Sequence, residues 1–227
     1  FNYLKELDVD CIVSKDINSK QVKNFPETFK NKIITINPLV KKDIYEFDSY
    51  NDNKDKFNIL IVGGSQGASI FDDNLKKSLV NISKKRPIRI IHQTNEKNIF
   101  NLNDYYSKNN IENKILSFDK NLAQYMQSSD LCITRAGAST LAELSIMNIP
   151  FIAVPLPTSK DNHQFENANF YRSNDCCWLI EQDQFEEKIE EILEEIFNNK
   201  SIYFKKKENL KKLNYQNTWI NVNQKIL

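Results

Sequence analysis

From residue 57 onward, short runs of apolar, often β-branched residues alternate with longer segments in which apolar residues recur with a helical period. The short runs predict strands at residues 58–62, 88–92, 114–118, 130–134, 151–154 and 177–180. The longer segments predict helices at residues 68–83, 96–108, 121–128, 138–147 and 162–173. This alternation is typical of βαβ units, so we expect an α/β domain with a doubly wound, parallel sheet of about six strands.

The rest of the chain predicts smaller units on either side of this domain. Residues 1–40 hold two strand-like runs, at 9–14 and 32–36, and two strands alone are too few for a stable sheet. We therefore expect residues 1–40 to be the incomplete end of a preceding domain and polar residues 41–56 to be a linker. The Rossmann-like domain then covers 57–182, and residues 183–227 predict two or three C-terminal helices with a solvated, charged face. Because the chain begins with Phe1, we expect a fragment or a processed form.

Composition excludes some classes of function. The 31 Lys and Arg residues nearly balance the 30 Asp and Glu residues, and no long block of one sign suggests a nucleic-acid-binding surface. No stretch approaches the ~20 apolar residues that span a bilayer, so we expect a soluble or peripheral protein. The four cysteines lack metal-ligand spacing, which favours buried thiols in a reducing, intracellular setting over disulfides.

All four glycines lie in two short turns, three of them within residues 62–68 and the fourth at Gly137. An average content of about 7% glycine would place ~16 in a chain of this length, so we infer that these two turns need glycine. Each turn follows a predicted strand and precedes a predicted helix, where α/β proteins bind phosphates. The first turn matches neither a Walker A loop nor a GxGxxG fingerprint, so a tight turn without a ligand stays an alternative.

The turn at Gly137 leads into a helix with two candidate ligand contacts. If this helix starts near Ala138, Thr140 and Glu143 lie three residues apart on one face. A carboxylate there could accept both hydroxyls of a ribose, while the nearby amides bind phosphate or sugar oxygens. A Glu in the first turns of a helix is also an ordinary response to the helix dipole, so this alternative stays open.

The segment after the predicted strand at 151–154 concentrates hydrogen-bonding side chains: Asp161, Asn162, His163, Gln164 and Asn167. Sugar hydroxyls need such partners, although helix capping by Asp161 or Asn162 explains part of the cluster. The other histidine, His92, ends a predicted strand, and we expect a packed, hydrogen-bonded structural residue there.

No Ser/His/Asp triad and no cluster with metal-ligand spacing is evident in the sequence. We therefore expect neither a metal nor a cofactor. The chemistry that these residues support is binding and electrostatic positioning rather than covalent catalysis.

Five segments carry a resemblance to one family. In order they are Gly-Gly-Ser-Gln-Gly-Ala at 63–68, His-Gln-Thr at 92–94, Phe118 ahead of Asn-Leu-Ala-Gln-Tyr-Met at 121–126, residues 130–143, and Asp-Asn-His-Gln-Phe-Glu-Asn-Ala at 161–168. Together they resemble the bacterial MurG-type transferases of glycosyltransferase family 28. These enzymes move N-acetylglucosamine (GlcNAc) from UDP-GlcNAc onto the undecaprenyl-linked muramyl-pentapeptide of peptidoglycan synthesis.

The resemblance covers about residues 9–180 and implies the GT-B arrangement, in which two Rossmann-like domains face a cleft and the second holds most of the donor. This chain would be the second domain with the end of the first. The implied contacts are Ser65, Gln66 and Gly67 by the diphosphate, Phe118 against the uracil with the backbone of Asp119 at its edge, Gly137, Ala138 and Thr140 near the phosphates and sugar, Glu143 on the ribose hydroxyls, and His163 and Gln164 on the GlcNAc hydroxyls. Arg135 is expected to support its turn.

The chain departs from the family in two places. Val40 stands where the family has an Arg near the nucleotide, and Lys41 or Lys42 could replace that charge; Asn95 stands where a Gly follows His-Gln-Thr. The resemblance places the general base, the glycine-rich loops and the apolar, membrane-facing patch in the missing first domain, so no catalytic residue is expected here. The implied partners are the UDP-GlcNAc donor, the undecaprenyl-linked acceptor through the missing domain, and the cytoplasmic face of the bacterial inner membrane as a peripheral site.

Two other functions remain open. A non-catalytic nucleotide-sugar-binding subunit would need a separate membrane partner, and residues 1–40 argue against it because they resemble the remnant of an attached domain. A UDP-GlcNAc epimerase of similar fold is disfavoured, because the acidic and histidine residues that such chemistry requires are not evident. As a transferase fragment, the chain is expected to bind the donor and transfer little by itself.

Overall fold

The computed structural model describes residues 12–14, 27–35, 40, 44, 55–63 and 69–214. Its main sheet has six strands: β3 (Phe57–Val62), β4 (Ile88–Gln93), β5 (Glu112–Leu116), β6 (Leu131–Thr134), β7 (Phe151–Ala153) and β8 (Cys177–Leu179). The helices between them are α2 (Ser69–Lys85), α3 (Glu96–Lys108), α4 (Leu122–Gln127), α5 (Ala138–Ile146) and α6 (His163–Ser173). Short 3-10 turns, η4 (Lys160–Asn162) and η5 (Gln182–Gln184), precede α6 and α7 (Phe185–Asn198), and α8 (Lys200–Asn214) follows.

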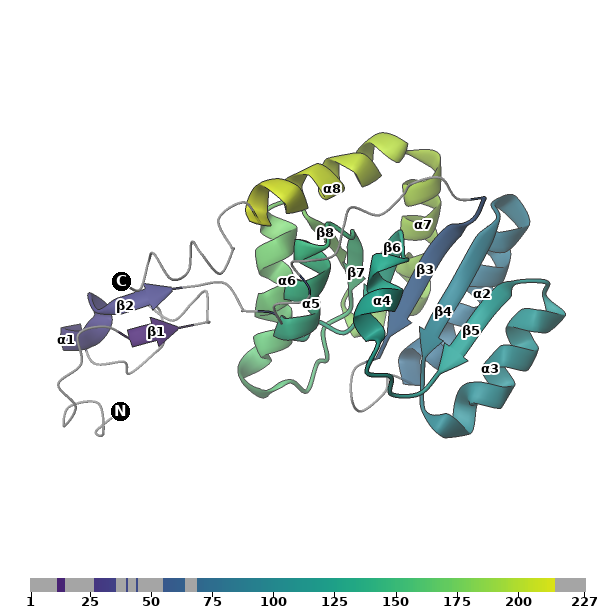
Figure 1. Ribbon diagram of the computed structural model, residues 1–227, viewed down its shortest axis with the longest axis horizontal. Helices are drawn as coiled ribbons and strands as arrows, with labels where there is room; N and C mark the ends of the chain where they lie inside the picture. Colours follow the sequence, from purple (N-terminus) through teal and green to yellow (C-terminus); the bar gives the residue numbers. More distant parts are fainter. Residues whose placement is uncertain are drawn as a thin grey trace.

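The six strands are parallel and lie in the order β5-β4-β3-β6-β7-β8. The order reverses between β3 and β6, so the chain builds one half of the sheet outward from β3 and then the other half outward from β6 (Figure 1). This arrangement confirms the predicted doubly wound sheet. All six strands end at the same edge, and the loops at this carboxyl edge are where such sheets bind ligands.

Helices cover both faces of the sheet, which explains why its central strands are almost wholly apolar. Ile59 and Ile61 of β3 pack with α2, α3 and α7, whereas Leu60 and Val62 pack with α4, α5 and α6. Figure 1 shows the second set of helices in front of the sheet and the first set behind it. The period-2 alternation of side chains therefore divides one continuous apolar run between two cores.

The edge strand β5 begins and ends two residues earlier than predicted, at Glu112–Leu116 instead of 114–118. Its first residues are polar, so hydrophobicity gave no sign of them. Backbone pairing with β4 holds them in the sheet, and the carboxylate of Glu112 adds ion pairs, 3.1 Å from Nε of Arg89 on β4 and 2.8 Å from Nζ of Lys56. The last pairing of the strand is the bond that the N–H of Thr94 donates to the carbonyl of Leu116, after which the chain leaves the sheet.

Outside the main sheet, β1 (Ile12–Ser14) and β2 (Ile33–Thr35) form a separate parallel pair, with α1 (Glu27–Lys30) between them in the chain.

Cys132, Cys176 and Cys177 are buried as free thiols, as expected, while Cys11 lies outside the described residues. Burial raises the pKa of the Cys176 thiol to about 11. Within the described part of the chain, no helix is both long enough and apolar enough to cross a membrane.

The C-terminal helix α7 is part of the domain core, because its apolar stripe of Phe185, Ile189, Leu193 and Ile196 is buried. Hydrogen bonds from Asn81 on α2 to the carboxylate of Glu190, at 3.0 and 3.1 Å, fix the two helices side by side. Lys85 and Glu194 form a further ion pair at the end of α2. The charged face of α7 is thus partly occupied by its neighbouring helix.

We predict that Leu193→Ala lowers the free energy of unfolding by about 2–4 kcal/mol, because it leaves a cavity between α7 and the sheet. Glu191→Ala on the exposed face of the same helix is the control and is expected to change it by less than ~0.5 kcal/mol. Urea unfolding of both variants measures the difference. Equal small effects would show that α7 does not share the core of the sheet.

Candidate functional site

The turn after β6 carries three predicted contacts at the start of α5. Gly137 precedes the helix with φ −68° and ψ 133°, Ala138 is its first residue and is exposed, and Thr140 follows in the first turn. A negative φ suits any residue, and a Cβ built on Gly137 would meet as its nearest atom Oγ1 of Thr140, at 3.9 Å. The inference that the backbone of this turn needs glycine is therefore wrong. Glycine instead leaves open space beside the first N–H groups of the helix.

Gln164 and Asn167 on α6 hold this turn by its backbone. Oε1 of Gln164 accepts hydrogen bonds from the N–H of Ala136 at 3.2 Å and from the N–H of Leu156 at 3.0 Å. Nδ2 of Asn167 donates to the carbonyl of Ala136 at 3.1 Å. The side-chain carbonyl of Gln164 is thus used to join the loops after β6 and β7, and its Nε2 is the atom left to donate to a ligand.

His163 begins α6 and is exposed at the same edge. Its Nδ1 lies 2.7 Å from the carbonyl of Lys160, and because a carbonyl only accepts, Nδ1 carries the hydrogen and Nε2 is free to accept one. Asp161 and Asn162 have φ values of 52° and 56°. Asn162 makes no side-chain capping bond, so the expected capping is wrong there. Asn and Asp tolerate the left-handed conformation that this tight turn requires.

Arg135 supports the site from within the protein, but its bonds go to neighbouring loops and not, as expected, to its own turn. Its guanidinium donates to the carbonyls of Val154 at 3.2 Å and Pro155 at 3.3 Å, and to Oε1 of Gln182 at 2.6 Å. It also lies over the ring of Phe71, 5.5 Å from the centroid. Burial lowers the pKa of Arg135 from its usual value. This one side chain fixes the ends of β6, β7 and β8 to the start of α2.

The loop after β5 presents an aromatic surface. Phe118 is 77% exposed, which is unusual for so large an apolar side chain. The carboxylate of the next residue, Asp119, accepts bonds from the N–H of Asn121 at 2.8 Å and from the hydroxyl of Tyr125 at 2.9 Å. These bonds lower the pKa of Asp119, the backbone bond from Asn121 most of all. The side chain of Asp119 therefore stabilises the loop, and the backbone of Asp119 is the part of this residue that can contact a ligand.

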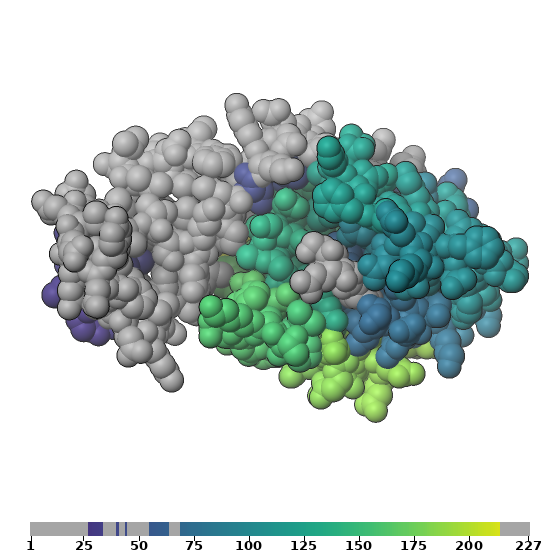
Figure 2. All heavy atoms as spheres, turned by 90° about the horizontal axis from the view of Figure 1, so that it is seen from below, coloured from purple at the N-terminus to yellow at the C-terminus, as the bar shows by residue number. Residues whose placement is uncertain are grey.

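The predicted contacts in the described part of the chain all lie at the carboxyl edge. Figure 2 looks onto this edge, with teal segments of α3 and α4 on one side and green segments of α6 on the other. Glu143, the predicted ribose contact, is half-buried on α5. Ser65, Gln66 and Gly67, predicted to lie by the diphosphate, fall outside the described residues; β3 and Gly63 lead into that turn.

A pocket of about 400 Å³ opens at this edge between the start of α6 and η5. It is lined by Ile70, Pro155, Pro157, Asn162, Phe165, Glu181, Gln182 and Asp183. Its two carboxylates make it unfavourable for a diphosphate but suitable for hydroxyl groups. Sequence reasoning did not find this pocket, because Glu181 and Asp183 lie beyond the segments with a recognisable motif.

Val40 also has a role that the sequence did not indicate. It is 5% exposed and packs with Ile44 against Ala142 of α5. Val40, which stands at the position of the family's Arg, thus makes an apolar contact in this chain. Lys41 and Lys42, which could replace the charge of that Arg, lie outside the described residues.

Comparison with known proteins decides the family. Residues 58–218 match the family described as the glycosyltransferase family 28 C-terminal domain. The chain belongs to this family. Its family 28 domain runs from β3 to beyond α8, and the expected fold class, a Rossmann-like sheet of the GT-B type, is confirmed.

Relatives of this family 28 domain include two named UDP-N-acetylglucosamine--N-acetylmuramyl-(pentapeptide) pyrophosphoryl-undecaprenol N-acetylglucosamine transferase. The one from Pelagibacter ubique is 46% identical, over 92% of this chain and 59% of the relative; the one from Rickettsia bellii is 35% identical, over 86% and 57%. The crystal structure of Acinetobacter baumannii MurG is 26% identical with a TM-score of 0.64, over 84% of this chain and 54% of that one. The chain therefore spans little more than half of the length of these proteins.

A buried polar cluster ties the first turn of α2 in the family 28 domain to β4 and α3. The carboxylate of Asp72 accepts bonds from Oγ1 of Thr94 and Nδ2 of Asn98, both at 2.7 Å, and lies 3.1 Å from Nε2 of His92. Nδ1 of His92 lies 3.3 Å from the hydroxyl of Tyr106. His92 is wholly buried, which confirms the prediction of a structural histidine.

Burial by itself would raise the pKa of Asp72, but the hydrogen bonds of His92, Thr94 and Asn98 outweigh it and lower the pKa. A carboxylate with a lowered pKa stabilises the folded protein above the pH at which Asp titrates in the unfolded chain, about 4, and this contribution is lost as the pH falls through the lowered value.

We predict that Asp72→Asn lowers the free energy of unfolding by about 2 kcal/mol at pH 7, because a buried acceptor of several bonds is replaced by a poorer one. The difference from the unaltered chain is expected to narrow below about pH 4. Denaturant unfolding between pH 3 and pH 7 measures it, with the exposed neighbour Asp73→Asn as the control. The same loss in both variants at pH 7 would contradict the role of the cluster.

Proposed function

We propose that this chain is the donor-binding part of a glycosyltransferase that moves GlcNAc from UDP-GlcNAc to undecaprenyl-pyrophosphoryl-MurNAc-pentapeptide in peptidoglycan synthesis. The observation that carries the proposal is the gathering of Phe118, Gly137, Ala138 and His163 at one edge of the sheet, on loops that follow three different strands. The names of the relatives, at 46% and 35% identity, support the same donor and acceptor.

The order of the strands supports this donor. Along the carboxyl edge, β5 leads to the predicted uracil contact, β3 to the predicted diphosphate turn and β7 to the predicted sugar contacts. This is the order of uracil, diphosphate and sugar in UDP-GlcNAc, although it is not the order of the strands in the chain; the predicted ribose contact Glu143, which follows β6, departs from it. The four strand spacings from β5 to β7 amount to roughly 19 Å, so a ligand that reaches both ends must lie extended along the edge.

The helix starts would stabilise the leaving group. The N-terminus of α5 carries a partial positive charge and free N–H groups beside Gly137, where negative charge grows as the diphosphate leaves. Nε2 of Gln164 and Nε2 of His163 would then position the sugar, one as a donor and the other as an acceptor. The acceptor hydroxyl would attack the anomeric carbon directly, without a covalent intermediate.

The remaining part of the proposed enzyme would bind the lipid-linked acceptor, supply the general base and approach the cytoplasmic face of the inner membrane as a peripheral protein. This part corresponds to the 41% of the Pelagibacter ubique relative that the chain does not cover. It follows that the chain by itself binds UDP-GlcNAc and transfers little.

We predict that Glu143→Ala weakens the binding of UDP about tenfold, because the carboxylate is proposed to accept both ribose hydroxyls. Binding of 2′,3′-dideoxy-UDP should change less than about twofold, since that ligand lacks both hydroxyls. Glu96→Ala is the control, because Glu96 is an exposed carboxylate in the first turn of α3, also at the carboxyl edge. Calorimetric titration of the unaltered chain and both variants with each ligand measures the six affinities. Equal losses for the two ligands would contradict a contact between Glu143 and the ribose.

A chimera tests the activity itself. Joining the N-terminal part of the Pelagibacter ubique relative to this chain is expected to produce transfer of radiolabelled GlcNAc to the lipid acceptor, whereas this chain alone produces little. A chimera that folds and binds UDP but transfers nothing would contradict the proposed transferase. The same result would favour the alternative function, a nucleotide-sugar-binding subunit.

A further inference from the structure

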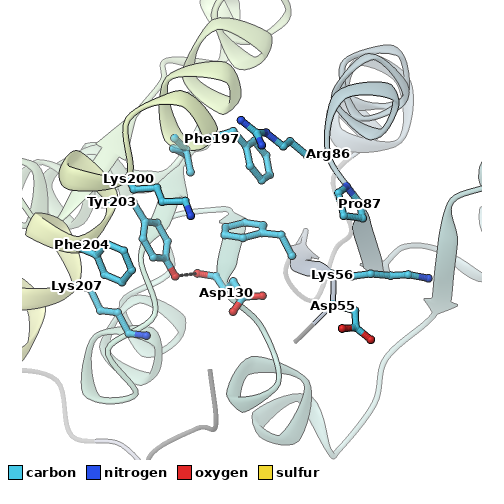
Figure 3. Close-up of a pocket in the computed structure, with 12 residues that line it drawn as sticks. Asp55, Lys56, Arg86, Pro87, Asp130, Phe197, Lys200, Tyr203, Phe204 and Lys207 are labelled. Carbon is cyan, nitrogen blue, oxygen red and sulfur yellow. Dashed lines mark hydrogen bonds between the residues drawn. The ribbon is translucent and has the colours of Figure 1, made fainter. Parts of the chain in front are cut away.

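A second pocket, of about 390 Å³, lies at the amino edge of the sheet, opposite the candidate donor site. It is lined by Phe57 at the start of β3, by Pro87 ahead of β4 and by Asp130 ahead of β6, together with residues from the end of α7 and from α8. Figure 3 shows the labelled side chains around it. Its volume is within the ~300–1,000 Å³ typical of small-molecule sites. Among its lining residues only Asp130 belongs to a segment that carries the family resemblance, and the proposed transfer uses none of them.

The apolar part of the pocket is a chain of four aromatic rings. Phe57 meets Phe197 with centroids 4.8 Å apart and Tyr203 at 5.8 Å, and Tyr203 meets Phe204 at 5.4 Å, all edge to face. Phe204 is 51% exposed at the rim. Aromatic surface of this kind binds hydrocarbon or another ring, because contact with either removes apolar area from water.

The polar part of the pocket is mainly basic. Lys200 and Lys207 extend from α8, and Arg86 stands across from them at the end of α2 (Figure 3). Within the described part of the chain, the side chains of Arg86 and Lys200 make no hydrogen bond or ion pair. Lys56, by contrast, is paired with Glu112 at 2.8 Å.

The two acidic residues of the pocket offset only part of this charge. Oδ2 of Asp130 accepts a bond from the N–H of Asn58 at 2.6 Å, and the backbone carbonyl of Asp130 accepts one from the hydroxyl of Tyr203 at 2.9 Å. Asp55 is exposed at the rim. With Lys56 paired to Glu112, three basic side chains stand against two acidic ones in the pocket, and this positive excess around Arg86 and Lys200 favours an anion.

We propose that this pocket binds an anionic amphiphile, namely a phosphate or carboxylate carried on an aromatic or acyl group. The anionic group lies between Arg86 and Lys200, where the guanidinium donates paired hydrogen bonds and the ammonium adds a point charge. The apolar group lies on Phe57, Tyr203 and Phe204. The source of this chemistry is either a soluble metabolite or a phospholipid headgroup with the first part of its acyl chains. The site is independent of the proposed transfer reaction.

Titration of the full chain with phenyl phosphate tests the charge requirement. The double variant Arg86→Gln/Lys200→Gln is expected to weaken binding about tenfold or more. The matched control, Lys84→Gln/Lys211→Gln, removes the same charge from exposed lysines outside the pocket and is expected to change binding less than twofold. Melting temperatures establish that both double variants are folded.

Two further measurements test the apolar requirement. Inorganic phosphate is expected to bind about tenfold more weakly than phenyl phosphate, and Phe204→Ala to weaken phenyl phosphate severalfold. Because Phe204 is exposed, its replacement should leave the melting temperature unchanged. If inorganic phosphate bound as tightly as phenyl phosphate, the proposal that the ligand is an amphiphile would be overturned.

Sedimentation with vesicles distinguishes the two sources. If the source is lipid, the chain should sediment with vesicles of phosphatidylglycerol and phosphatidylcholine in equal parts, and the pocket double variant should lose this binding while the control keeps it. If the source is soluble, only the phenyl phosphate titration should separate the two double variants. The proposal is overturned if neither probe binds at millimolar concentration or if both double variants behave alike with both probes.

Discussion

Burial of the parallel sheet on both faces is the constraint on which the rest of the molecule depends. Every strand must be followed by a helix that returns across one face, so the helix starts and the strand-to-helix loops gather at a single edge. Unpaired N–H groups and positive dipole ends gather there with them. Apolar residues such as Ile59 and Leu60 thereby decide, through the two cores that they fill, where an anionic ligand can bind.

The loops after β6 and β7 at this edge are fixed by side chains that bond to their backbone groups. Arg135 holds the carbonyls that follow β7, and Gln164 holds the N–H groups of two loops. Such bonds leave the loops little freedom, so a ligand would meet groups that are already oriented. The cost of binding is reduced because the ordering of these loops has taken place during folding.

The hydrophobic pattern was sufficient to predict the strands, the main helices and the direction of the sheet. It misplaced β5, because the polar first residues of this strand are placed by backbone pairing with β4, which hydrophobicity along the chain does not reveal. It could not show that Gln164 uses its carbonyl on the backbone, since an amide offers both a donor and an acceptor. Gly137 was misjudged for a similar reason: a sequence does not distinguish glycine kept for its φ angle from glycine kept for space.

The two backbone bonds of Gln164 also bear on how such a domain can evolve. A carboxylate has nearly the same shape as the amide and would accept both N–H groups, so the loops after β6 and β7 would keep their positions. Only the outward donor would become an acceptor. A single-nucleotide change from a glutamine to a glutamate codon could thus alter the preferred ligand without unfolding the turn, which makes position 164 a place where specificity can drift while the scaffold stays intact.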